Sequence, residues 1–141
     1  MLIIYTNFDL FTLMLPKEHN QQYQKLSQLL NQLQENVLER ELAKILATNQ
    51  EVQQLFETQI INLDNSGLDQ PIASQVQSYL TEIHKQFRLL NVDVSFLQAS
   101  RNPQTTQTRL ANMSDRLETL KGYCLSILGQ ATSKQNQEET G

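Results

Sequence analysis

Residues 71–100 read PIASQVQSYLTEIHKQFRLLNVDVSFLQAS, and this stretch decides the fold class of the chain. Its apolar side chains return every three or four residues, which is the period of one face of an α-helix. The stretch therefore predicts a single unbroken helix, about 45 Å long at about 1.5 Å per residue. The members of this apolar stripe are Ile72, Val76, Tyr79, Ile83, Phe87, Leu90, Val94 and Leu97.

A second helix follows directly. Asn102-Pro103 ends the first one, because proline restricts the residue before it and is well suited to open a helix. The next apolar stripe runs to Ile127, and Gly129 stands where a C-cap glycine is expected. Two long helices with so short a connection pack as an antiparallel hairpin. The second stripe consists of Thr106, Leu110, Met113, Leu117, Leu120, Cys124 and Ile127.

The N-terminal half carries weaker helix signals. A heptad stripe from Tyr23 to Val37 predicts a helix from Pro16 to about Ala47, with a slip of register before Leu42. Thr48 or Asn49 can then cap a short second helix that carries Val52 to Leu63 on one side. The stretch 64–67, Asp-Asn-Ser-Gly, is the clear breaker before residue 70.

These elements predict an all-α fold, an antiparallel helical bundle of three to four long helices. The alternative is an elongated hairpin that forms a homodimer. We expect the bundle domain to span residues 14–129. Residues 130–141 have no apolar side chain beyond Ala131, so we expect a disordered tail.

Residues 1–13 are interpreted as a dispensable N-terminal extension, because Met14 followed by Leu15-Pro16 offers an alternative start. The apolar run at 1–15 lacks the basic residues of a signal peptide and is too short to span a bilayer. We therefore expect no membrane association. The single cysteine, Cys124, forbids an intramolecular disulfide and fits a reducing compartment, so we expect a cytoplasmic protein.

Charge divides the chain. The net charge is −4 overall, with −5 over residues 1–70 and +2 over residues 71–129. The overall negative sign argues mildly against a general nucleic-acid binder. The C-terminal half could instead face an acidic partner.

No pattern in the chain indicates chemistry. The glycines stand alone at 67, 122, 129 and 141, so there is no phosphate-binding loop. His19 and His84 lack the Glu-x-x-His repeats of a helical di-metal site. Cys124 lies on the apolar stripe, as a small core residue would. We therefore expect no enzyme activity: no catalytic, cofactor-binding or metal-binding residues, and no small-molecule substrate.

One polar cluster stands out on the two C-terminal helices. His84, Lys85 and Arg88 lie within one helical turn, and Arg109 and Arg116 are seven residues apart on one side. Such a cluster is either a solvated surface or a basic docking surface for an acidic protein. The candidate partner-binding residues are Glu82, His84, Lys85, Arg88, Arg101, Arg109 and Arg116.

The strings from Leu80 to Leu90 and from Val92 to Arg101 resemble the core of the PatD family, the cyanobacterial heterocyst-frequency control proteins. Pro103 to Arg109, Asp115-Arg116-Leu117 and Tyr123-Cys124 are also similar, and Leu15-Pro16 and Gln22-Tyr23-Gln24 more loosely so. The resemblance covers residues 14–128, and the first thirteen residues have no place in the family pattern.

The resemblance implies a non-enzymatic cytoplasmic regulator linked to cell division through the tubulin-like GTPase FtsZ. Proteins of this family influence filament assembly, cell size and heterocyst frequency. The alternative is a nucleic-acid-binding or transcriptional regulator that uses the same basic helical face, although no helix-turn-helix is recognisable.

Overall fold

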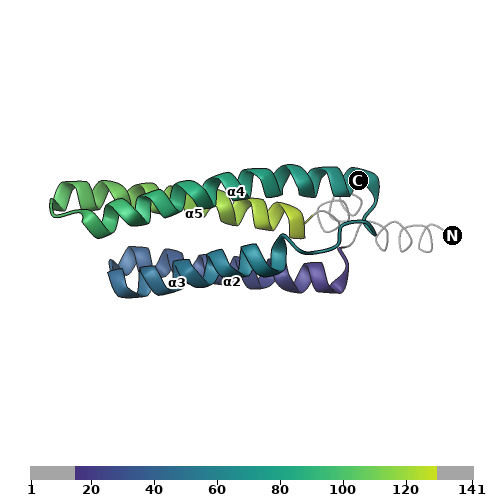
Figure 1. Ribbon diagram of the computed structural model, residues 1–141, viewed down its shortest axis with the longest axis horizontal. Coiled ribbons are helices and arrows are strands. Elements are labelled where there is room, and N and C mark those ends of the chain that lie inside the picture. Colours follow the sequence, from purple (N-terminus) through teal and green to yellow (C-terminus); the bar gives the residue numbers. More distant parts are fainter. Residues whose placement is uncertain (1–14, 130–141) are drawn as a thin grey trace, which may run out of the picture.

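The computed structural model describes residues 15–129, which form one elongated bundle of helices (Figure 1). Its helices are α2 (Lys17–Glu39), α3 (Leu42–Leu55), α4 (Gln70–Ala99) and α5 (Pro103–Leu128), and a π-helical turn, η1 (Phe56–Ile60), continues α3. They run alternately in opposite directions, and this described part contains no strand. The predicted all-α antiparallel bundle is thereby confirmed. The predicted extension at 1–13 and tail at 130–141 lie outside the described residues.

The α4–α5 hairpin matches its prediction closely. Asp69 precedes α4 and Pro71 lies in its first turn. Asn102 caps α5, because its side-chain Oδ1 accepts a hydrogen bond of 2.9 Å from the backbone N–H of Gln104. Gly129 follows α5 as expected, but its φ of −91° is not left-handed, so this position does not depend on glycine.

The predicted helix from Pro16 to Ala47 is wrong, because the chain reverses at Arg40. Arg40 has φ 59° and ψ 34°, a left-handed conformation. Its N–H bonds to the carbonyl of Val37, and the N–H of Glu41 bonds to that of Asn36. This pair of bonds is a Schellman motif, which usually has glycine at the left-handed position. The slip of register seen before Leu42 was therefore a change of helix.

The predicted cap at Thr48 or Asn49 is also wrong. Both residues are buried inside α3, where they make hydrogen bonds to other helices. Asn36 Nδ2 donates to Thr48 Oγ1 at 2.8 Å, and Asn49 Nδ2 donates to Asn91 Oδ1 at 3.1 Å. Because partners on α2 and α4 satisfy these polar groups, both can lie within a helix.

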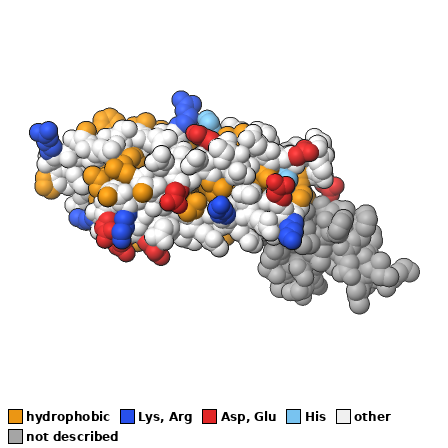
Figure 2. Space-filling model, turned by 60° about the horizontal axis from the view of Figure 1, so that its bottom comes forward, with side chains coloured by type: hydrophobic (Ala, Val, Ile, Leu, Met, Phe, Trp, Pro, Cys, Tyr) orange, Lys and Arg blue, Asp and Glu red, His pale blue; other side chains and the backbone are white. Residues whose placement is uncertain are grey.

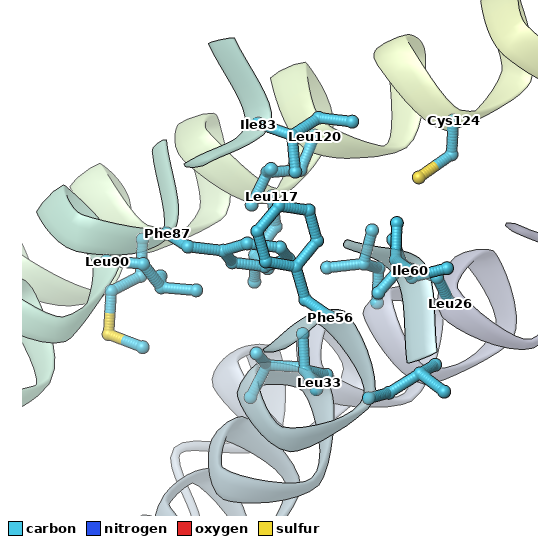
Figure 3. Close-up of a cluster of buried hydrophobic side chains, with 14 of the residues drawn as sticks. Leu26, Leu33, Phe56, Ile60, Ile83, Phe87, Leu90, Leu117, Leu120 and Cys124 are labelled. Atoms are coloured by element: carbon cyan, nitrogen blue, oxygen red, sulfur yellow. The ribbon is translucent and has the colours of Figure 1, made fainter. Parts of the chain in front are cut away.

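The core fills the space between the four helices. Phe56 of η1 packs between the layers against Phe87 of α4, with ring centroids 4.9 Å apart. Figure 3 shows Leu117 and Leu120 of α5 and Leu33 of α2 around this pair. The apolar stripes predicted from the sequence therefore face inward, with Phe87 and Leu117 buried as expected.

The four helices do not pack equally closely. α5 packs along both α2 and α4, and α3 packs along α2, whereas α3 and α4 pack less closely than the other neighbouring helices. Side-chain bonds bridge this last seam, including one from Gln53 Nε2 to the carbonyl of Phe87 at 3.5 Å. Among neighbouring helices, the α3 and α4 backbones are thus held together least closely by direct packing. In the described part, no helix combines the length and apolarity needed to cross a membrane.

Candidate functional site

The seven candidate residues divide into two groups with different surroundings. Glu82, His84, Lys85 and Arg88 are exposed in the middle of α4, and Arg101 is exposed in the turn that leads to α5. Arg109 and Arg116 are half-buried on α5 and point to a carboxylate of α4. The structure therefore places the first four on one exposed stretch of α4, with Glu82 turned away from His84, and assigns the last two to a contact inside the protein.

Asp93 is the carboxylate that holds Arg109 and Arg116. Its Oδ2 lies 2.6 Å from Arg116 Nε, and its Oδ1 lies 3.3 Å from Arg109 Nη1. Asp93 is only 1% exposed, whereas the two arginine side chains are 28% and 27% exposed. A carboxylate buried so deeply needs charged partners, so these arginines fasten α5 to α4.

Arg109 has a second contact within the bundle. Its guanidinium carbon lies 4.2 Å above the centre of the Phe96 ring, a cation–π geometry. Asp93 could have been suspected from the sequence, because it is a carboxylate between two valines with two arginines seven residues apart further along.

Lys85, Arg88 and Arg101 form no ion pair with any described residue. By contrast, Lys44 pairs with Glu41 at 2.9 Å, and Lys121 with Glu118 at 3.3 Å. Figure 2 brings the α2–α3 side forward, and charges of both signs are interspersed across the face it presents. We use the name basic face for His84, Lys85 and Arg88; Arg101 is thirteen residues beyond Arg88, about 20 Å along the helix direction at about 1.5 Å per residue, and lies outside this face.

A hollow of about 330 Å³ lies beside the basic face, in the open seam between η1 and α4. His84 belongs to both features, because its ring lines the hollow and lies 6.1 Å from the Phe56 ring. Ile61 forms part of the opposite wall and is 48% exposed despite its apolar side chain. The lining consists of Phe56, Ile61, Asn65, Gln77, Leu80, Thr81 and His84.

The π-helical turn shapes this wall of the hollow. The N–H of Ile61 bonds back to the carbonyl of Phe56 at 3.0 Å, five residues earlier. The wider turn lets Leu55, Phe56 and Ile60 all reach the core, and the chain then leaves the bundle at Ile61. π-Helical turns occur frequently at functional sites. Nothing in the sequence pattern predicted this feature.

Two groups that could act as nucleophile or base, the Cys124 thiol and the Tyr23 hydroxyl, are buried in the core away from this surface. Burial raises the pKa of the Cys124 thiol to about 12, and it raises the pKa of the Tyr23 hydroxyl well above its usual range. Neither group is therefore activated as a nucleophile or general base near neutral pH. Within residues 15–129, no three His, Cys, Asp or Glu side chains are grouped to hold a metal ion.

The fold and this surface define the chain as a helical-bundle protein with a candidate contact site formed by the basic face and the adjoining hollow. Protein-family models, curated proteins and solved structures were all compared with the chain, and none matches it.

Proposed function

We propose that this protein is a non-enzymatic adaptor that binds an acidic protein partner through the basic face. The observation that carries this proposal is the absence of a described carboxylate paired with Lys85 or Arg88. Unpaired cations on one helix attract an acidic surface and set the orientation in which it docks. Because they lie off the apolar stripe, they can do so without disturbing the core.

The resemblance to the PatD family supplies the partner in this proposal. We propose that the partner is the division GTPase FtsZ, and that binding modulates its assembly in the cytoplasm of a cyanobacterium. Cell division and heterocyst frequency would follow from that effect. The string from Leu80 to Leu90, which carries the most specific part of the resemblance, also contains the three residues of the basic face. This coincidence supports the proposal.

Sedimentation of FtsZ with increasing amounts of this protein tests the proposal. We expect the wild type to change the polymer yield, and the double variant Lys85→Glu/Arg88→Glu to lose that effect through charge repulsion. Folding should be preserved, since exposed charges contribute little to stability. Intact activity of the folded double variant would show that the basic face is only solvated.

The matched control is Lys17→Glu/Lys25→Glu, which makes the same change of charge at two exposed positions of α2. This control should act like the wild type. An unchanged polymer yield at every ratio would rule out FtsZ as the partner. DNA binding at low salt that disappears steeply as salt rises would favour the nucleic-acid alternative instead.

A further inference from the structure

We propose that the hollow between η1 and α4 receives one bulky apolar side chain of the partner, from a segment in which Asp or Glu residues flank that side chain. This inference rests on the proposed function, because it specifies which kind of acidic segment the same surface recognises. It goes further than the proposed function, because it assigns a pocket between η1 and α4 and a preferred sequence in the partner segment, which charge alone would not specify.

The first argument is the size and lining of the hollow. Its volume of about 330 Å³ is at the lower end of the range for small-ligand pockets, about 300–1,000 Å³. Phe56, Ile61 and Leu80 provide an apolar floor and wall, while Gln77, Thr81 and His84 provide polar groups. A space of this size and character suits one large side chain, with its backbone near the polar groups.

The second argument is that both walls are held in place while the seam between them stays open. Phe56 is fixed in the core against Phe87. The loop after η1 is tied to α2, because Asn65 Oδ1 lies 3.1 Å from His19 Nε2. The hollow already lies open between these two walls, so a side chain can enter without displacing a helix. A preformed pocket loses little free energy to reordering on binding.

The third argument is charge complementarity. Arg88 is one helical turn beyond His84 and therefore flanks the α4 side of the hollow, whereas Lys85 is about 100° round the helix from His84, at the outer edge of the same side. Glu82 is about 160° round the helix from His84 at about 100° per residue, so it faces away from the hollow. On the opposite side the carboxylates belong to Glu57 of η1 and to Asp64, the residue before Asn65 of the lining. The acidic residues of the partner segment should therefore contact α4.

Synthetic peptides test this inference without any FtsZ. The probes are fluorescein-labelled peptides with one Phe between aspartates, the same peptide with Ala in place of Phe, and one with Lys in place of Asp. We expect the Phe peptide to bind best, and the Ala peptide to bind about tenfold or more weakly. In spectra of the full ¹⁵N-labelled chain, the Phe peptide should shift the amides of Ile61, Thr81 and His84.

A pocket-filling variant gives the matched comparison. Thr81→Trp should block the hollow and weaken the Phe peptide to the level of the Ala peptide. Thr108→Trp is the control, because both threonines are exposed helical residues whose hydroxyl donates at 3.0 Å to the carbonyl four residues earlier. Gln77→Trp fills the hollow from a second position and serves if Thr81→Trp lowers the melting temperature.

The outcomes separate this inference from the proposed function. Equal binding of the Phe and Ala peptides, both lost in Lys85→Glu/Arg88→Glu, would overturn the pocket and leave the basic face standing. Tighter binding of the Phe peptide than of the Ala peptide, without any effect on FtsZ, would support the pocket and remove FtsZ as the partner. Failure of every acidic peptide to bind, or shifts confined to residues outside the seam, would overturn the inference.

Discussion

Arg40 adopts a backbone conformation that glycine normally supplies, and it does so at the turn that makes α2 and α3 antiparallel. The left-handed region costs an L-residue about 1–2 kcal/mol. The burial of Ile45, Val52 and Leu55 next to α2 outweighs this cost, since burying one such side chain contributes about 1.5–3 kcal/mol. Arg40 is thus strained by its neighbours' packing.

Arg40→Gly should therefore stabilise the protein by about 1 kcal/mol, after allowing for the extra freedom of glycine in the unfolded chain. Urea denaturation followed by circular dichroism measures the change. Ala47→Gly in α3 is the control, and it should destabilise the protein by about 1 kcal/mol because its backbone is helical. A loss of stability in Arg40→Gly would contradict the Schellman assignment.

Asp93 gives a second prediction at this scale. Arg116→Ala should lower the free energy of unfolding by about 2 kcal/mol, because it leaves a buried carboxylate without its closest partner. Arg109→Ala should cost less, since its nitrogen lies 3.3 Å from Asp93 rather than 2.6 Å. Thermal melting measures both. A variant of either arginine that keeps full stability but loses partner binding would return that arginine to the docking surface.

At the scale of the helices, position on the apolar stripe decides what a substitution costs. Phe87→Ala should lower the free energy of unfolding by about 3–5 kcal/mol, because Phe87 is 2% exposed and its removal leaves a cavity. Leu117→Ala should cost about 2–5 kcal/mol for the same reason. Denaturant titration measures each change.

Phe96→Ala is the matched control on the same helix, since Phe96 is 50% exposed. It should cost about 1 kcal/mol or less, mainly through its contact with Arg109. Similar costs at Phe87 and Phe96 would mean that the register of α4 is wrong.

Periodic burial explains which elements were predictable from the sequence. The apolar stripes predicted the bounds of α4 and α5 to within about a residue, because core positions recur at the helical period. The end of α2 was missed because arginine does not signal a left-handed residue. Thr48 and Asn49 looked like caps because their partners, Asn36 and Asn91, lie 12 and 42 residues away along the chain.

The candidate site was predictable only in part, for the same reason. The exposure of Lys85 and Arg88 follows from their offset from the stripe. The burial of Arg109 against Asp93 depends on how α5 is placed beside α4, which local sequence does not specify. The hollow depends on η1 and on the open seam, and both are properties of the assembled bundle.

The whole molecule has a charge division that should govern how its binding responds to salt. Charges on the basic face are exposed, and salt screens such charges over about 8 Å at physiological ionic strength. The affinity for an acidic partner should therefore fall steadily from 50 to about 500 mM salt. Titrations at several salt concentrations measure this slope.

In Lys85→Glu/Arg88→Glu the affinity should depend little on salt concentration, whereas in Lys17→Glu/Lys25→Glu it should depend on salt as in the wild type. The two double variants have equal net charge, so they separate the local contribution of α4 from the overall charge. Equal slopes in both variants would indicate that long-range attraction, rather than the basic face, drives association.

Cys124 is a natural probe of local unfolding, because its reaction with a thiol reagent reports when its position opens. The thiol is fully enclosed where α5 meets α2, and burial raises its pKa to about 12, so a thiol reagent at pH 8 cannot react with the closed state. Because the chain has one cysteine, every labelling event reports the opening of this position alone. The labelling rate, compared with that of the denatured chain, then gives the free energy of opening under native conditions, with no engineered probe.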